Sequence, residues 1–169
     1  GHLDFVTASG VKCLSGQFIL DEFRRASRDE VTSMDTLQSL PRVYSPVPKV
    51  FDKLVATVQS LQSEFLRVFL TRVLERKDRL EAFLNAPASV NYHHAYPGGL
   101  LEHSLNVANN AVAMLRLNEP TMPRLMQEAC FVAGLLHDIG KTYTYDSKGK
   151  PNAAWKLCSH DAFTLEACA

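Results

Sequence analysis

The chain has 169 residues and no net formal charge at pH 7; 46% of its residues are hydrophobic and 21% are charged. This composition is typical of a globular domain with one sizeable core. The even charge balance argues against bulk electrostatic binding to nucleic acid or to a membrane, and it leaves a local basic patch open.

The sequence shows no membrane-spanning segment and no secretory leader. Its longest apolar stretch, around residues 131–136, is far shorter than the roughly 18 residues that cross a bilayer. The first four residues lack a basic start and an apolar core. The four cysteines have no CxxC spacing, which indicates reduced thiols rather than a zinc site. We therefore expect a cytoplasmic location and no membrane partner.

Residues 1–45 predict an irregular N-terminal extension, which we interpret as the remnant of another domain. Residues 1–16 fit no single pattern, whereas residues 18–27 have the apolar spacing of a helix. Residues 40–48 hold three prolines, so we expect an extended segment there.

Residues 46–169 predict a helical domain, so the expected fold class is all-α (mainly α). Apolar residues recur at every third or fourth position between residues 50 and 74, and a break at residues 60–64 predicts two helices. Further helices are expected at residues 77–84, 100–117 and 125–138 and from residue 159 onward, with a polar loop over residues 141–152. The chain has no initiating Met and ends in helix-forming residues, so we expect it to be a piece of a longer protein, truncated at its C-terminus.

A histidine and an aspartate, His137 and Asp138, stand side by side at the polar end of an apolar run. Burying a carboxylate there costs several kcal/mol unless it is paired or bound to a metal. His103 lies on the otherwise apolar face of the preceding helix, and imidazole together with carboxylate suits a divalent cation. The alternatives are an ion pair between Asp138 and Lys141 and a hydrogen-bonded core histidine at position 103.

Three other side chains could act on a phosphate group. His93 and His94 precede the turn Pro97-Gly98-Gly99, where glycine lets backbone approach a ligand closely. One of them could donate to a phosphate, or both could be solvated loop residues. Lys141 can neutralise a phosphate oxygen.

The chain resembles the HD-superfamily metal-dependent phosphohydrolases from about residue 41 to residue 169. The resemblance rests on His93-His94-Ala95-Tyr96-Pro97-Gly98-Gly99-Leu100-Leu101-Glu102-His103 and on His137-Asp138-Ile139-Gly140-Lys141. These segments look most like the HD domain of TraI-type conjugal-transfer relaxase/helicase proteins, and they are also similar to the YhaM-type 3′-5′ exoribonucleases. The fold that the resemblance implies is the HD-domain helical bundle.

The resemblance also implies a ligand set for a divalent metal, Mn²⁺, Mg²⁺ or Fe. His103, His137 and Asp138 would hold the ion, and His160 and Asp161 are further ligand candidates; the alternative for that second doublet is the N-cap of a helix. The catalytic candidates are Asp138, Lys141, His93 and His94. An aspartate on a helix well downstream normally completes the family's site. Because only Asp146 and Asp161 follow Asp138, we expect the closing aspartate beyond residue 169, and weak metal binding without it.

The implied function is a metal-dependent phosphohydrolase or phosphodiesterase that acts on nucleic acid, with single-stranded DNA or RNA as the partner. Tyr143, Tyr145 and Trp155 could stack on bases or could anchor loops. Three alternatives stay open: an exoribonuclease, a nucleotide phosphohydrolase, and a non-catalytic module that binds nucleic acid or a protein partner.

Overall fold

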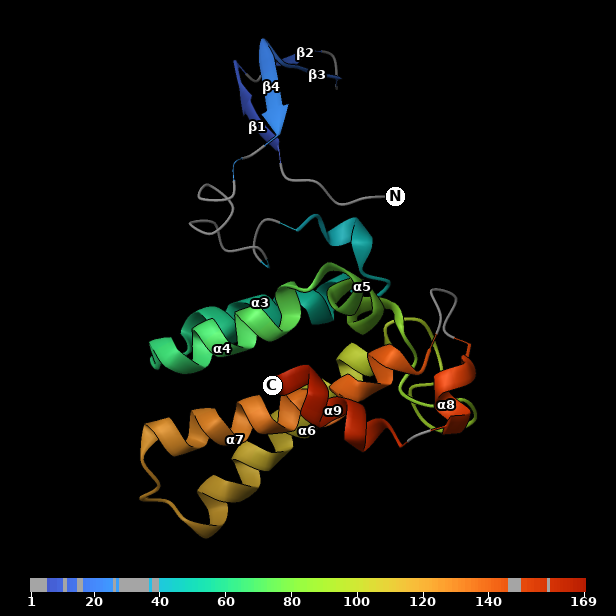
Figure 1. Ribbon diagram of the computed structural model, residues 1–169. Coiled ribbons are helices and arrows are strands. Elements are labelled where there is room, and N and C mark those ends of the chain that lie inside the picture. Colours follow the sequence, from blue (N-terminus) through green and yellow to red (C-terminus); the bar gives the residue numbers. More distant parts are fainter. Residues whose placement is uncertain are drawn as a thin grey trace. The chain divides into compact units, whose positions relative to one another are not determined.

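The computed structural model describes residues 6–10, 12–14, 17–25, 27, 37, 40–145, 150–157 and 159–169. The chain divides into two compact units, residues 1–39 and residues 40–169 (Figure 1). Among the described residues, no helix combines the length and the apolar character that crossing a bilayer requires.

The described part of the first unit forms short antiparallel strand pairs. Strand β1 (Val6–Ser9) pairs with β4 (Glu22–Arg25), and β2 (Lys12–Leu14) pairs with β3 (Gln17–Ile19). The helix predicted for residues 18–27 is therefore wrong. Its apolar spacing was misleading because Phe23, which would have faced a core, is 72% exposed on β4. Pairing with a strand elsewhere in the chain decided the structure, and a local period cannot show such pairing.

The second unit is helical, which confirms the mainly α prediction. Its α-helices are α3 (Pro48–Ser60), α4 (Glu64–Glu75), α5 (Lys77–Asn85), α6 (Gly99–Asn118), α7 (Arg124–Leu136), α8 (Ala153–Leu157) and α9 (His160–Cys168). The predicted break at residues 60–64 separates α3 from α4. Two 3₁₀ helices, η1 (Arg42–Tyr44) and η2 (Ile139–Tyr143), occupy segments predicted as extended chain and polar loop. Pro48 begins α3 because the first helical position needs no N–H donor.

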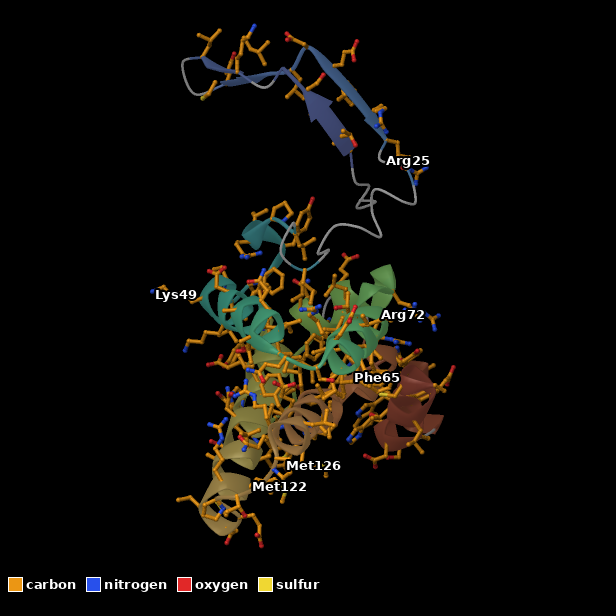
Figure 2. All side chains as sticks on the ribbon, turned by 90° about the vertical axis from the view of Figure 1, so that its left-hand side faces the viewer. Arg25, Lys49, Phe65, Arg72, Met122 and Met126 are labelled. Carbon is orange, nitrogen blue, oxygen red and sulfur yellow. The ribbon has the colours of Figure 1, made fainter. Side chains whose placement is uncertain are left out.

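The apolar faces of these helices pack into one core. Figure 2 shows side chains filling the space between the helices, while Lys49 and Arg72 point away from it. Leucine and phenylalanine dominate the fully buried positions, which include Phe51, Leu54, Leu70, Leu74, Phe83, Leu84, Leu100, Leu101 and Leu135. Burial of this apolar surface is the main source of stability.

Helices α6 and α7 form an antiparallel hairpin that carries most of the candidate site, and they lie side by side in Figure 1. Their backbones approach closely at Gly134, where an added Cβ atom would lie 2.8 Å from the Cα atom of Ala108. Glycine at this position therefore permits the crossing. The hairpin brings the first turns of α6 beside the last turn of α7.

Glu128 joins α7 to the turn between α3 and α4. Its buried carboxylate accepts the backbone N–H groups of Gln62 and Ser63 at 3.0 and 2.9 Å and the Nε–H of Arg124 at 2.8 Å. Burial alone would raise the pKa of Glu128, but these hydrogen bonds outweigh burial and lower the pKa below its usual value. Ser63 is in turn the N-cap of α4, so one carboxylate on α7 holds the start of another helix.

Candidate metal centre

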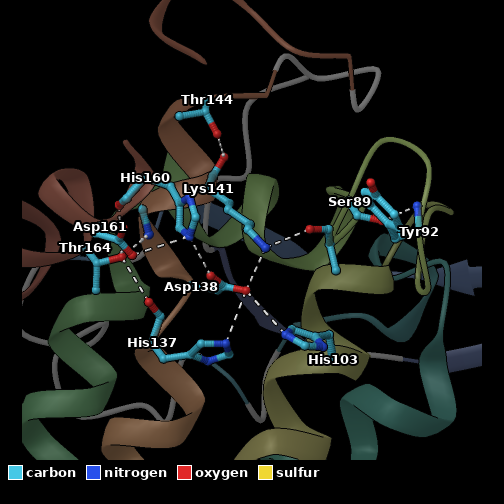
Figure 3. Close-up of polar contacts among 12 residues, drawn as sticks. Ser89, Tyr92, His103, His137, Asp138, Lys141, Thr144, His160, Asp161 and Thr164 are labelled. Atoms are coloured by element: carbon cyan, nitrogen blue, oxygen red, sulfur yellow. Dashed lines mark hydrogen bonds and ion pairs between the residues drawn. The ribbon is translucent and has the colours of Figure 1, made fainter. Parts of the chain in front are cut away.

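Asp138 lies where the chain passes from α7 into η2. Helix α7 ends at Leu136, His137 keeps α-helical backbone angles, and Asp138 leaves them, with φ −109° and ψ 12°. The side chain of Asp138 is 7% exposed. A carboxylate this well buried needs cations or hydrogen-bond donors around it, and Figure 3 shows basic side chains converging on it.

Three imidazoles from separate parts of the chain face this carboxylate. The Nε2 atoms of His103 on α6 and of His137 lie 3.4 and 3.2 Å from Asp138 Oδ2, and Nε2 of His160 on α9 lies 3.1 Å from Asp138 Oδ1 (Figure 3). The ring centroids of His103 and His137 are 5.2 Å apart. The fold therefore gathers three of the predicted ligands around the fourth.

A hydrogen bond to the backbone sets the orientation of His137. Its Nδ1 atom lies 2.8 Å from the carbonyl oxygen of Gly134, which can only accept, so Nδ1 carries a hydrogen. In the neutral ring, Nε2 then carries a lone pair that is directed at Asp138 Oδ2. Two electron pairs that face each other in this way need a cation or a proton between them. Fixing of the far ring nitrogen by a carbonyl is the usual support for a histidine that ligates a metal.

The pKa shifts favour an ionised carboxylate beside imidazole. Burial opposes the charge on Asp138, yet hydrogen bonds from His137 and Lys141 outweigh burial and hold the pKa of Asp138 well below its usual value. The hydrogen bond to Asp138 raises the pKa of His137. Burial lowers the pKa of His103 by more than the charge of Asp138 raises it. At neutral pH, His103 is therefore in the uncharged form that can ligate a cation.

Lys141 reaches across the site from η2. Its Nζ atom lies 2.7 Å from Asp138 Oδ2 and donates to the carbonyl oxygen of Ala88 at 2.8 Å. The ion pair that was the alternative interpretation of Asp138 is thus present. Among the described residues these contacts use two of the three N–H donors of the ammonium group.

His93 and His94 lie on the loop between α5 and α6, and their rings border His103. The ring centroids of His93 and His94 lie 5.8 and 5.6 Å from that of His103. The carbonyl oxygen of His94 accepts the N–H of Ala88 at 3.0 Å. An added Cβ atom on Gly99 would lie 2.0 Å from the same oxygen, which explains a glycine at that position. The predicted role of both histidines at a phosphate stays a prediction.

The two residues of the second doublet, His160 and Asp161, lie in different environments. His160 faces Asp138, whereas the side chain of Asp161 is 78% exposed, lies 3.5 Å from His160 Nε2 and accepts a hydrogen bond from Ser159. Ser159 is the N-cap of α9, so the capping alternative describes this turn. Asp146, the other aspartate after Asp138, lies outside the described residues.

Two residues that support the site, Gly140 and Thr164, were not among the residues predicted to form it. The hydroxyl of Thr164 accepts the N–H of Gly140 at 3.0 Å and lies 3.2 Å from the carbonyl oxygen of His137. An added Cβ atom on Gly140 would lie 1.9 Å from the carbonyl oxygen of His160, so α9 packs directly on η2. The glycine after the His-Asp pair was the one available signal for this contact.

The aromatic side chains proposed for base stacking differ in accessibility. Tyr145 is 7% exposed and Tyr143 stacks on Phe163 with ring centroids 5.4 Å apart, so both anchor their segment. Trp155 is 50% exposed. Tyr92, which the sequence did not single out, is 80% exposed on the loop that carries His93.

Two groups of three donors could hold a cation within the described part of the chain. One is His103, His137 and Asp138, and the other is His93, His94 and His103; within each group the ligand atoms lie within 4.8 Å of one another. The first group offers two imidazole nitrogens and a carboxylate oxygen, which fits a divalent transition-metal ion such as Mn²⁺. Either the proton of an imidazolium or a bound cation can join His137 Nε2 to Asp138 Oδ2 across their 3.2 Å separation.

Most of the helical unit, with the greater part of the site, matches a known protein family. The model of the TraI_2 family, described as "Putative helicase", matches residues 43–155, which is more than half of the chain. The matched segment includes His103, His137, Asp138 and Lys141, and it ends before His160.

Two kinds of curated relative are similar to the chain. A dihydroneopterin 2′,3′-cyclic phosphate phosphodiesterase of Methanocaldococcus jannaschii is 44% identical over 64 residues, which are 37% of this chain and 26% of that protein. The 3′-5′ exoribonuclease YhaM of Bacillus subtilis is 27% identical over 127 residues, 74% of this chain and 37% of that protein. The chain thus spans about a quarter to somewhat over a third of the length of these relatives. No solved structure matches the chain.

Proposed function

Because the chain belongs to the TraI_2 family and folds a His/Asp cluster that fits a divalent cation, we propose that it is a metal-dependent phosphodiesterase domain acting on single-stranded nucleic acid. The observation that carries the proposal is the convergence of His103 and His137 on the buried carboxylate of Asp138. The similarity to two kinds of phosphodiester-cleaving enzyme supports the reaction class.

Each residue of the site has a part in this proposal. His103, His137 and Asp138 hold the cation, and His160 adds a donor on the side of α9. A bound divalent cation would polarise a phosphoryl oxygen and lower the pKa of a water molecule. Lys141 steadies a phosphate oxygen with its remaining N–H donor. The products are a phosphate monoester and an alcohol.

The loop that Lys141 contacts supports nucleic acid as the substrate. Tyr92 donates its N–H to Ser89 Oγ at 3.0 Å, and Ser89 Oγ donates to the carbonyl oxygen of His93 at 3.0 Å. These bonds hold the loop beside Ala88, whose carbonyl binds Lys141 (Figure 3). An exposed aromatic ring on a braced loop next to a phosphate site is a platform on which a base can stack.

Substitution of Asp138 tests the reaction. We expect Asp138→Asn to lower the affinity for Mn²⁺ at least a hundredfold and to abolish cleavage of single-stranded RNA, single-stranded DNA and bis-p-nitrophenyl phosphate, because the ligating charge is lost. Titration calorimetry and product assays measure both effects, and circular dichroism checks the fold. Asp52→Asn, at a side chain that is 58% exposed, is the matched control. Cleavage by Asp138→Asn within twofold of the unchanged chain would refute the proposal.

A small cyclic phosphodiester is the second candidate substrate, and the 44% identity to the cyclic phosphate phosphodiesterase favours it. Tyr92→Ala separates the two. For a single-stranded nucleic acid we expect the variant to raise KM about tenfold, since base stacking is worth about 1–3 kcal/mol. For bis-p-nitrophenyl phosphate KM should not change. Cleavage of 2′,3′-cyclic nucleotides alone, indifferent to Tyr92→Ala, would select the second candidate.

A further inference from the structure

The second group of donors lies outside the proposed catalytic cluster except for His103. It consists of three imidazoles and no carboxylate. His93 is exposed, while His94 and His103 are partly buried. The rings of His93 and His94 meet edge to face, with centroids 5.6 Å apart and planes at 82°. This arrangement turns the three rings toward one another without making one flat stack.

His94 carries two independent marks of a built site. Its Nδ1 atom is buried and has no hydrogen-bond partner among the described residues. Buried polar atoms in folded proteins are nearly always satisfied, so an orphan nitrogen calls for a partner such as an ion. Its backbone has φ +59°, and it is the one non-glycine residue in the described part of the chain with a positive φ. Residues held in this strained region concentrate where function requires a fixed geometry.

The loop is built to hold His94 in that conformation. Its carbonyl oxygen is fixed by the N–H of Ala88 and is closely covered by Gly99. The ring of Tyr96 has its centroid 5.9 Å from that of His94, and the Tyr96 hydroxyl donates its hydrogen to Glu102. The hydrogen bond with Glu102 raises the pKa of Tyr96 to about 12, so the phenol keeps its proton. Packing alone would explain clustered rings, but it would not explain an orphan nitrogen held at the cost of backbone strain.

We propose that His93, His94 and His103 form a second metal position, which takes an imidazole-seeking ion such as Zn²⁺. Three neutral nitrogen donors suit Zn²⁺, whereas Mg²⁺ prefers oxygen donors. Because His103 belongs to both donor groups, occupation of one position affects the other. The ion also gives His93 and His94 a way to act near a phosphate at the edge of the site. The proposal rests on the donor geometry and does not require the proposed reaction.

Zinc titration of the full 169-residue chain tests this position in a His137→Ala background, which weakens the other donor group. We expect this variant to bind Zn²⁺, and we expect addition of His93→Gln and His94→Asn to lower its affinity at least tenfold. Asparagine is chosen at position 94 because it tolerates a positive φ. With Co²⁺ as the probe, the same two substitutions should remove the visible absorption band of the bound ion.

The control combines His137→Ala with Glu119→Gln, at an exposed residue outside both donor groups, so Zn²⁺ affinity should change less than twofold. Equal affinity with and without His93 and His94 would overturn the proposal, since the ion would then sit on Asp138 and His160. If circular dichroism shows that the combined variant is unfolded, His93→Gln alone, at an exposed residue, should still weaken Zn²⁺ binding severalfold. Unchanged affinity in that variant would also overturn the proposal.

Discussion

At the scale of single residues, Asp138 serves several partners with one carboxylate. Its Oδ2 atom faces His103, His137 and the ammonium of Lys141. Lys141 therefore supplies positive charge at the oxygen that a metal ion would also use. Two like charges at one oxygen repel, and the buried setting strengthens the repulsion. Lys141 should consequently favour a phosphate and weaken the metal.

Removal of the Lys141 charge should therefore strengthen metal binding and weaken phosphate binding. Lys141→Met removes the charge 2.7 Å from Asp138 Oδ2 and keeps the apolar stem. We expect Mn²⁺ to bind several times more tightly and KM for bis-p-nitrophenyl phosphate to rise about tenfold, which corresponds to about 1.4 kcal/mol. Calorimetry and steady-state kinetics give the two numbers. Lys156→Met, at an exposed lysine, is the control and should change neither. A fall in Mn²⁺ affinity would show that Lys141 supports the metal.

At the scale of elements, α7 connects two tasks. Glu128 near its beginning holds the turn between α3 and α4, and His137 follows its end. The helix itself was predictable from the apolar period of residues 125–138. The hydrogen bonds of Glu128 to the turn between α3 and α4 could not be predicted. A glutamate in an amphipathic pattern is expected to face solvent, and the partners of Glu128 are backbone groups more than sixty residues earlier.

The lowered pKa of Glu128 predicts a pH-dependent contribution to stability. A carboxylate whose pKa is lower in the folded state stabilises the fold above its unfolded pKa, about 4.3, and this stabilisation is lost as the pH falls through the folded pKa. Glu128→Gln should therefore cost about 2 kcal/mol at pH 7, a typical loss for hydrogen bonds to a buried charged group. The difference between the two proteins should shrink toward pH 3.

Urea unfolding at pH 7 and at pH 3.5, with Glu119→Gln at an exposed glutamate as the control, measures this dependence. An equal loss of stability at both pH values would mean that Glu128 acts through packing rather than through its charge.

The candidate site shows how far local patterns reach. The sequence was enough to identify the neighbours His137 and Asp138, the histidine on the preceding helix and the glycine turn as parts of the site. The docking of α9 against η2 does not, because Thr164 and Gly140 are ordinary residues whose meeting depends on the tertiary path. The strands of the first unit were harder still to predict. They are short and exposed, so they show no alternation of buried and exposed residues that would identify a strand.

At the scale of the whole molecule, the division of the chain predicts that the helical unit can stand alone. The core residues of α3 to α7 and every described member of the candidate site lie within residues 40–169. We expect residues 40–169 to fold with a stronger helical signal per residue than the full chain. Mn²⁺ should bind with an affinity within twofold of that of the full chain. Circular dichroism and calorimetry check this, and a tenfold loss of Mn²⁺ affinity would contradict it.

The α6–α7 hairpin has a consequence for the order in which the molecule assembles. His103, His137 and Asp138 all belong to residues 99–143, whereas α9 brings His160 from further along the chain. Contacts within a hairpin close early, because a short connection loses little entropy. A cation can therefore find most of its ligands before α9 has docked on η2. Such early capture would make the ion a nucleus for folding as well as a working part of the finished site.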